Sequence, residues 1–359
     1  MQPLPAPPSA PRRHIAKLVV SLILLGGFAW MLQRGGIPLV PSRSAFANVS
    51  VAWVVGYAAL YTLTTWLRTY RWVYLLRPIA DVRASRVIGI GLIGFTAILF
   101  APLRMGEVVR PYLLSRRAAV TFTQAMGTVA AERIVDGLFV SAMLLVALFA
   151  SHPLSPMPDH LGGLSIPVSR VPAATYATLA VFVSAFIAMG VFHWRRAFAE
   201  RATLAVVGVV SKPLASWLTK HVEHVADGLG FLPDVRHSAP FFRDTTLYWL
   251  SLVAGTWALL RASGIHASGT EACVVMGVVS LGILIPAGPG FFGAYQLAAY
   301  TALAMYFPEA QVLSAGAAYV FLSYLIQILG SILGMLVGFW LDQEPTIDGV
   351  PLTRRDRAR

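Results

Sequence analysis

The sequence predicts an all-α integral membrane protein, in which about six full transmembrane helices and two re-entrant helical hairpins are arranged as an inverted repeat. The chain is 57% hydrophobic and only 12% charged, whereas a soluble globular domain is about 25% charged. Apolar stretches of about 18 residues or more recur along the chain, as membrane-spanning helices require. The sequence lacks the alternating segments of about ten residues that build a membrane barrel.

Six stretches are long and apolar enough for full spans. Their expected bounds are 15–33, 48–67, 122–150, 172–193, 245–261 and 311–340. Two further apolar stretches, 87–114 and 270–306, are interrupted at their centres by Pro and Gly. We expect each interruption to divide its stretch into the two arms of a hairpin.

The chain is expected to divide into one transmembrane domain and two cytoplasmic tails. The expected parts are a disordered tail at 1–14, a transmembrane domain at 15–342 with its first repeat at about 48–150 and its second at about 245–340, and a basic tail at 343–359. Between the repeats, residues 194–243 mix apolar and basic positions. This composition predicts an amphipathic segment on the cytoplasmic membrane surface.

Arginine and lysine gather in alternate flanks of the expected spans, and cytoplasmic flanks are the ones enriched in these residues. They are frequent in 12–17, 68–86, 194–243 and 354–359, and they are few in 34–47, 151–171 and 262–270. These counts fit the positive-inside rule if both termini are cytoplasmic. The fit also requires that 87–114 enters and leaves the membrane on the cytoplasmic side, and that 270–306 enters and leaves it on the outside. The charge distribution therefore favours two re-entrant hairpins of opposite orientation.

The two interrupted stretches also resemble each other. FAPLRMGEVVRPYLL (100–114) aligns with LIPAGPGFFGAYQLA (284–298), so that Pro102 pairs with Pro286 and Gly106 with Gly290. An inverted repeat of this kind is typical of alternating-access transporters. Irregular backbone at membrane depth requires protein or a water-filled cavity to satisfy its polar groups. We therefore expect a cavity between the two repeats.

Three charged residues, Arg104, Glu107 and Arg110, follow the first break at intervals of three. A helix that starts near Pro102 places them on roughly one face. Its N-terminus offers free N–H donors and a partial positive charge, which favour an anion. The alternative is that Glu107 only neutralises one of the two arginines. Because charges inside a membrane are costly and tend to be functional, we expect this face to contact substrate.

A second charged cluster, Glu132, Arg133 and Asp136, lies in the middle of the expected span 122–150. At the usual helical rise it is about 15–20 Å from the start of the helix. A trio of charges at that depth is not expected to face lipid. Two roles stay open for it: an ion-pair lock between helices, for instance from Arg133 to Glu107, or a substrate site.

Arg68 and Arg71 lie one turn apart at the cytoplasmic end of the second expected span, close to Trp72 and Tyr74. Arginine beside aromatic residues at that depth suits lipid phosphates in the headgroup belt. Ordinary interfacial anchoring is the alternative.

Several classes of chemistry lack their usual motifs in this sequence. The single cysteine, Cys273, allows no disulfide framework and no thiol cluster. The histidines lack metal-ligand spacing, and neither a P-loop nor a dinucleotide-binding fingerprint is present. The net charge of +12 comes mostly from arginine; a GC-rich genome with the cytoplasmic bias of basic residues explains it, and phosphate binding is the alternative. We therefore expect no metal, no cofactor and no nucleic-acid partner.

The chain resembles the lysylphosphatidylglycerol synthase transmembrane-region family, also described as flippase-like, over about residues 15–342. Four motifs carry the resemblance, in order: RTYRW…LLRP, P-L-R-M-G-E-x-x-R, A-E-R-x-x-D and P-A-G-P-G-x-x-G-A-Y-Q. In multidomain members the membrane region moves aminoacylated phospholipids across the bilayer. This chain ends about twenty residues after its last expected span, so the resemblance implies the translocating part without a synthase domain.

The motifs and the charged clusters together give the candidate site. The candidate substrate-binding residues are Arg68, Arg71, Arg104, Glu107, Arg110, Glu132, Arg133 and Asp136. The candidate hairpin backbone positions are Pro102, Gly106, Pro286, Gly288, Pro289, Gly290, Gly293, Tyr295 and Gln296.

The expected function is that of a flippase-like transporter in a bacterial cytoplasmic membrane, which moves a membrane phospholipid or a lipid-linked substrate by its polar or phosphate-bearing headgroup. An integral-membrane enzyme that modifies a phospholipid or polyprenyl-linked headgroup, with Glu132 or Asp136 as base, is one alternative. A small-solute transporter of similar architecture is another. The lipid, the energy source and the oligomeric state stay open at this point.

Overall fold

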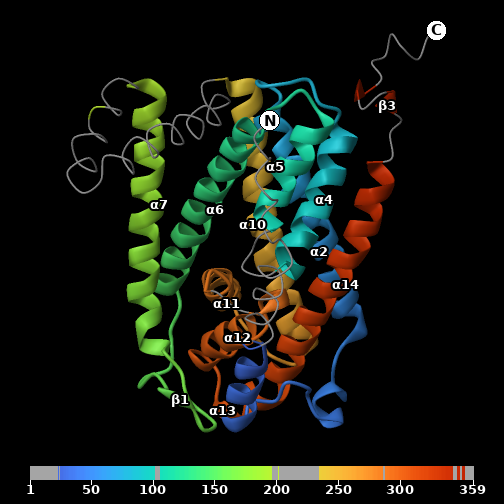
Figure 1. Ribbon diagram of the computed structural model, residues 1–359. Helices are drawn as coiled ribbons and strands as arrows, with labels where there is room; N and C mark the ends of the chain where they lie inside the picture. The colour runs from blue at the N-terminus through green and yellow to red at the C-terminus, as the bar shows by residue number, and fades with distance from the viewer. Residues whose placement is uncertain are drawn as a thin grey trace, which may run out of the picture.

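The computed structural model describes residues 23, 25–101, 106–195, 201, 234–285, 288–342, 346–347 and 350–351. Over these residues the fold is helical, apart from loops and two short β-hairpins (Figure 1). The longer helices are α2 (Val51–Tyr70), α4 (Ala84–Phe100), α5 (Gly106–Arg117), α6 (Phe122–Ala150), α7 (Val171–Trp194), α10 (Val235–Ala262), α11 (Gly269–Gly282), α12 (Ala294–Ala304) and α14 (Ala317–Leu341). The shorter elements are η1 (Arg43–Phe46), α3 (Trp72–Leu76), β1 (His160–Leu161), β2 (Leu164–Ser165), η3 (Val168–Arg170), η4 (Pro289–Phe291), α13 (Glu309–Gln311), the π-helical η5 (Val312–Gly316), β3 (Thr346–Ile347) and β4 (Val350–Pro351).

Three helical stretches in the described part of the chain are long and apolar enough to cross a membrane: Phe122–Ala150, Val168–Ala188 and Glu309–Leu341. They coincide with three of the six expected full spans. Large apolar side chains are exposed along their outer faces, for instance Val181 on α7 and Leu333 on α14. Exposed apolar surface of this extent suits contact with lipid. The predicted all-α, multi-pass membrane architecture is thus confirmed at this level.

The other expected spans differ from the structure mainly at their ends. The span 48–67 corresponds to α2, and 245–261 lies within α10. Helix α10 starts earlier than expected because Asp234 caps it, where its carboxylate accepts a hydrogen bond from the Arg236 N–H at 2.9 Å. The expectations for 1–14, for about half of 15–33, for most of 194–243 and 343–359, and for Pro102, Arg104 and Pro286 lie outside the described residues.

Helices α4 and α5 form an antiparallel hairpin. The Arg86 guanidinium, near the start of α4, donates to the carbonyl of Arg117 at the end of α5, at 3.0 Å. Further along, Gly94 faces Arg110, and Gly106 packs on the backbone of Ala97 and Ile98. A Cβ atom at Gly94 would overlap the Arg110 side chain, so glycine there lets the arginine cross α4. The structure therefore brings the two ends of the 87–114 stretch together.

Helices α11 and α12 form the second hairpin, and Gly282 packs against Ala298 between its arms. Between the arms, η4 and the two residues after it turn the chain, and three residues there have positive φ: Gly290 at 73°, Phe291 at 57° and Gly293 at 90°. Glycine adopts this conformation without a steric penalty. A bulky residue such as Phe291 does so only when its surroundings hold it there.

The two hairpins point toward each other and meet at their tips. In Figure 1, α4 and α5 lie in the upper half of the molecule, and α11 and α12 lie in the lower half. At the contact, Ile98 and Leu99 of α4 pack with Phe291 and Tyr295 in a small buried cluster. The resulting arrangement places the two interrupted stretches of the sequence face to face.

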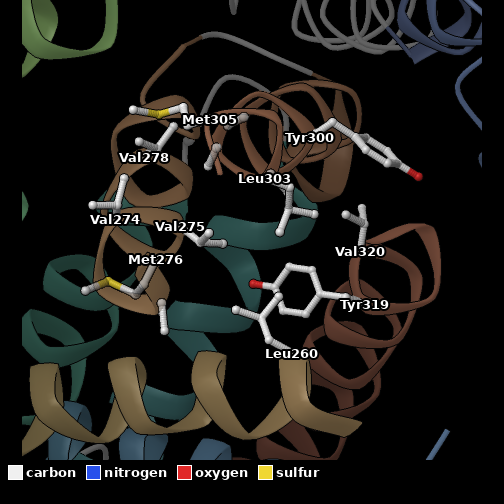
Figure 2. Packing of buried hydrophobic residues seen from close by; sticks show 14 of the residues in the cluster. Leu260, Val274, Val275, Met276, Val278, Tyr300, Leu303, Met305, Tyr319 and Val320 are labelled. Carbon is white, nitrogen blue, oxygen red and sulfur yellow. The ribbon is translucent and has the colours of Figure 1, made fainter. Parts of the chain in front are cut away.

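The largest hydrophobic core lies beside the second hairpin. Figure 2 shows Leu260 of α10, Leu303 of α12 and Tyr319 of α14 converging in this core, with Val275 of α11 beside them. All except Tyr319 have no solvent-exposed surface, and Tyr319 is 3% exposed. Close packing on three sides gives α12 a rigid position, although a helix of 11 residues is too short to cross a bilayer, at the usual rise of about 1.5 Å per residue.

The hairpin geometry can be tested by accessibility to a membrane-impermeant maleimide. In a Cys273→Ala background, we expect Asp81→Cys and Ala119→Cys, which flank α4 and α5, to react from one side of the membrane. Met157→Cys lies beyond the far end of α6 and should react from the other side. Reaction of the first two from opposite sides would show that the α4–α5 stretch crosses the membrane.

Candidate functional site

A buried network of charged side chains connects α2, α5 and α6. Arg71, between α2 and α3, binds Asp136 of α6 with both terminal nitrogens, at 2.7 Å from Nη1 to Oδ1 and 2.6 Å from Nη2 to Oδ2. Its Nη1 also donates to Thr245 of α10 at 3.2 Å. Because Arg71 has no exposed surface, this two-pronged pair lies in a low-dielectric interior, where it is held firmly.

Glu132 of α6 is the centre of the network. Its carboxylate accepts hydrogen bonds from Arg71 at 3.0 Å, from Arg110 of α5 at 3.0 Å, and from Arg133 at 2.9 Å. Glu132 and Arg110 are both fully buried, whereas the Arg133 side chain is a quarter exposed. A single carboxylate thus ties the first hairpin to both α2 and α6.

Aromatic rings complete the surroundings of the arginines. The guanidinium of Arg68 lies 3.8 Å from the centroid of the Phe95 ring, and that of Arg110 lies 4.4 Å from the same ring. Arg110 also lies 4.2 Å from the centroid of Trp72, whose indole N–H donates to Thr128 at 3.0 Å. Contacts of this kind stabilise a desolvated cation without neutralising it.

The charges of this region do not balance. Glu107, in the first turn of α5, is half-buried and interacts electrostatically with Arg133. Counting it, three carboxylates face four guanidiniums among the described residues of this region, which leaves one positive charge in excess. The residues counted are Arg68, Arg71, Arg110, Arg133, Glu107, Glu132 and Asp136. The excess favours an anion nearby, because an unpaired buried charge is costly.

A cavity of about 200 Å³ lies next to this network, between the two hairpins. Residues of α2, α4, α10, α11, η4, α12 and α14 line it. Arg68 of α2 is the charged residue among the described lining residues, and Phe95 stands beside it. Arg68 forms no ion pair with any described residue, so its guanidinium is the cation best placed to meet a ligand in the cavity.

The structure brings most of the predicted charged residues together, but in surroundings that differ from those expected. Arg71, expected at the headgroup belt, is instead enclosed by protein, since α6 presents two carboxylates to it. Arg110 is likewise enclosed, whereas Arg68 reaches the cavity. The Arg133 guanidinium donates a hydrogen bond to its neighbour Glu132 at 2.9 Å, and it also interacts electrostatically with Glu107, the pair given above as an example of an ion-pair lock.

The predicted hairpin positions fall into two groups. Tyr295 lines the cavity and donates to Ser323 of α14 at 2.9 Å. The others shape the turn: Gly288 approaches the helical residue Leu25, Pro289 starts η4, and the Gln296 side chain accepts from the Gly293 N–H at 2.7 Å.

Sequence reasoning missed Phe95, which lies in an unbroken apolar run and gives no local signal. It also missed the polar face of α2, formed by Tyr57, Tyr61, Thr64 and Arg68. This face carried a signal, because the four positions follow the i, i+4, i+7, i+11 spacing of one helical face. Within the described residues, no group of three or more His, Cys, Asp or Glu is placed to hold a metal ion.

Comparison with known proteins gives two matches. A model of the family described as Lysylphosphatidylglycerol synthase TM region matches residues 15–331. The protein named glycosyltransferase AglD, from Haloferax volcanii, is 27% identical over 303 residues, which make up 78% of this chain and 47% of that protein. This chain therefore spans about half the length of that relative. No solved structure matches this chain.

Removal of Arg71 tests whether the ion-pair network supports the fold. Because Arg71→Met leaves two buried carboxylates short of a partner, we expect it to lower the free energy of unfolding by about 3–5 kcal/mol. Arg77→Met, at an exposed position six residues further on, should change it by less than about 0.5 kcal/mol. Unfolding of both variants would be followed in mixed detergent micelles. Equal stability of the two would contradict the structural role of the network.

Proposed function

Since the chain belongs to the lysylphosphatidylglycerol synthase transmembrane-region family, we propose that it is a flippase-like lipid transporter. In this proposal a phosphate-bearing headgroup crosses the bilayer through the cavity between two re-entrant hairpins, while the acyl chains stay in the bilayer. The observation that carries it is the position of Arg68, a cation without an ion-pair partner among the described residues, in a cavity enclosed by opposed hairpins.

Arg68 is the proposed phosphate ligand. Guanidinium groups suit phosphate because their planar fork donates to two oxygens at once. The Phe95 ring, 3.8 Å from the guanidinium, holds Arg68 at the cavity wall. The carboxylates that could otherwise neutralise Arg68 are held elsewhere, since Glu132 and Asp136 bind Arg71, Arg110 and Arg133.

Movement of the headgroup requires the cavity to open to each side in turn. The proposed moving contact is the one between the hairpin tips, where Ile98 and Leu99 meet Phe291 and Tyr295. This contact is small and apolar, while each hairpin is anchored elsewhere: α5 by Glu132, and α12 by the large core. A headgroup that binds more tightly when the tips separate would shift the population toward the open state.

An integral-membrane enzyme is the second candidate, favoured by the name of the archaeal relative, which indicates glycosyl transfer by that protein. In this chain the proposed bases, Glu132 and Asp136, do not line the cavity and are both bound by arginine. A carboxylate in that state is a poor general base, because its negative charge is already stabilised. The geometry therefore supports translocation better than headgroup chemistry.

The proposed location is the bacterial cytoplasmic membrane, with both termini in the cytoplasm. The positive-inside distribution of the flanks supports this orientation. The start of α4 and the end of α5 carry four arginines: Arg83, Arg86, Arg116 and Arg117. The contact between Arg86 and Arg117 joins these two helix ends. These four arginines thus lie together at one end of the first hairpin, which the proposal places on the cytoplasmic side.

Reconstitution in proteoliposomes tests the transport proposal. The vesicles contain phosphatidylglycerol with a fluorophore on an acyl chain, and dithionite added outside quenches the fluorophores of the outer leaflet. When the protein is present, we expect dithionite to quench more fluorescence than the outer leaflet alone accounts for. Arg68→Gln should slow this transfer about tenfold or more, because a charge-assisted hydrogen bond contributes about 1.5–3 kcal/mol. Arg77→Gln is the matched control on an exposed arginine of the same segment, and it should transfer lipid at the unmodified rate.

Three outcomes would contradict the proposal. Mass spectrometry that finds a modified headgroup would support the enzyme instead. Absence of lipid transfer together with uptake of a water-soluble phosphate ester would support a small-solute transporter. Full activity of Arg68→Gln would remove Arg68 from the site.

A further inference from the structure

We propose that the cavity is selective for a headgroup that joins its phosphate to an uncharged polyol or sugar, and that it excludes headgroups bearing a primary amine. This inference rests on the proposed function and specifies its substrate class. The polyol or sugar could belong to a glycerophospholipid or to a polyprenyl-linked phosphate, and both present the same chemistry to the cavity.

The charge of the lining is the first argument. Among the described residues that line the cavity, Arg68 carries the only charge, and none is a carboxylate. An ammonium group in a space of about 200 Å³ would lie close to this guanidinium, and like charges in a partly buried site repel strongly.

Hydroxyl groups on the lining are the second argument. Thr64 of α2 is 5% exposed, and its Oγ1 has no hydrogen-bond partner among the described residues. A buried hydroxyl without a partner costs free energy, which a ligand hydroxyl would recover. Thr65 of α2 and Ser280 of α11 already donate to the carbonyls of Tyr61 and Met276. Their oxygens therefore still accept hydrogen bonds, and a polyol donates them.

The position of these groups along α2 is the third argument. Thr64 lies four residues before Arg68 on one helical face, so their side chains are neighbours about one turn apart. A headgroup with phosphate at Arg68 would place its next carbon atoms, and their hydroxyls, beside Thr64. The cavity volume of about 200 Å³ is smaller than the roughly 300–1,000 Å³ of a pocket for a drug-sized ligand. It therefore suits a headgroup rather than a whole lipid.

Selectivity would be measured in proteoliposomes with lipids that carry a fluorophore on the acyl or prenyl chain and differ in the headgroup. The probes are phosphatidylglycerol, phosphatidylinositol, a polyprenyl hexosyl phosphate, lysyl-phosphatidylglycerol, and lysyl-phosphatidylglycerol with both amines acetylated. We expect the lysyl lipid to move at least tenfold more slowly than its acetylated form, which is slightly larger but lacks the two positive charges. The rates of the two phospholipids and of the polyprenyl lipid identify which source of polyol is preferred.

The two proposals fail in different ways in this experiment. If no probe moves faster than in protein-free vesicles, the proposed function is wrong and this inference is wrong with it. If the lysyl lipid moves as fast as its acetylated form, translocation stands but selectivity against amines is overturned.

A substitution at Thr64 tests the hydroxyl contact. Thr64→Val keeps the shape and removes the hydroxyl, so we expect phosphatidylinositol transfer to slow about two- to tenfold while transfer of phosphatidic acid, which lacks a polyol, is unchanged. Thr62→Val is the matched control, because Thr62 lies on the exposed face of the same helix. An equal effect of Thr64→Val on both lipids, or no effect on either, would overturn the role of Thr64.

Discussion

The Glu132 carboxylate, shared by three arginines from three segments of the chain, is the interaction on which the rest of the site depends. Arg71 comes from the end of α2, Arg110 from the returning arm of the first hairpin, and Arg133 from α6 itself. Each of these charges would be expensive in a membrane protein interior on its own. Each therefore requires a partner of opposite charge, and the pairs with Glu132 hold the first hairpin against α2 and α6.

The same requirement explains why Arg68 is left for the cavity. Asp136 is bound by both nitrogens of Arg71, and the oxygens of Glu132 are used by Arg71, Arg110 and Arg133. Arg68, one turn before Arg71, contacts the Phe95 ring rather than a carboxylate. The structural arginines and the proposed ligand-binding arginine therefore differ in the neighbours they have, although they belong to the same residue type and the same region.

The two opposed hairpins also close the cavity where their tips meet, and the contact between the tips is small. The turn of the second hairpin contains Gly290, Phe291 and Gly293, which all adopt positive φ. Ion pairs join the first hairpin to α2 and α6, and its helix α4 also packs along α14. The second hairpin is held by apolar packing around Leu303 and Tyr319 (Figure 2). In the proposed mechanism, the tips can separate without disturbing either anchor.

The sequence by itself determined the helical membrane class, three of the expected spans and the family, since hydropathy and motif spacing are properties of neighbouring residues. It also predicted that the charges of 104–110 and 132–136 belong to one region, and the structure does join Arg110 to Glu132. What only the tertiary structure decided was which arginine is enclosed and which reaches the cavity. That choice depends on partners far apart in the chain, such as Arg71 and Thr245, which are 174 positions apart. The periodicity of a sequence reports only on residues a few positions apart. Contacts between residues so far apart in the chain form only when the helices pack in three dimensions.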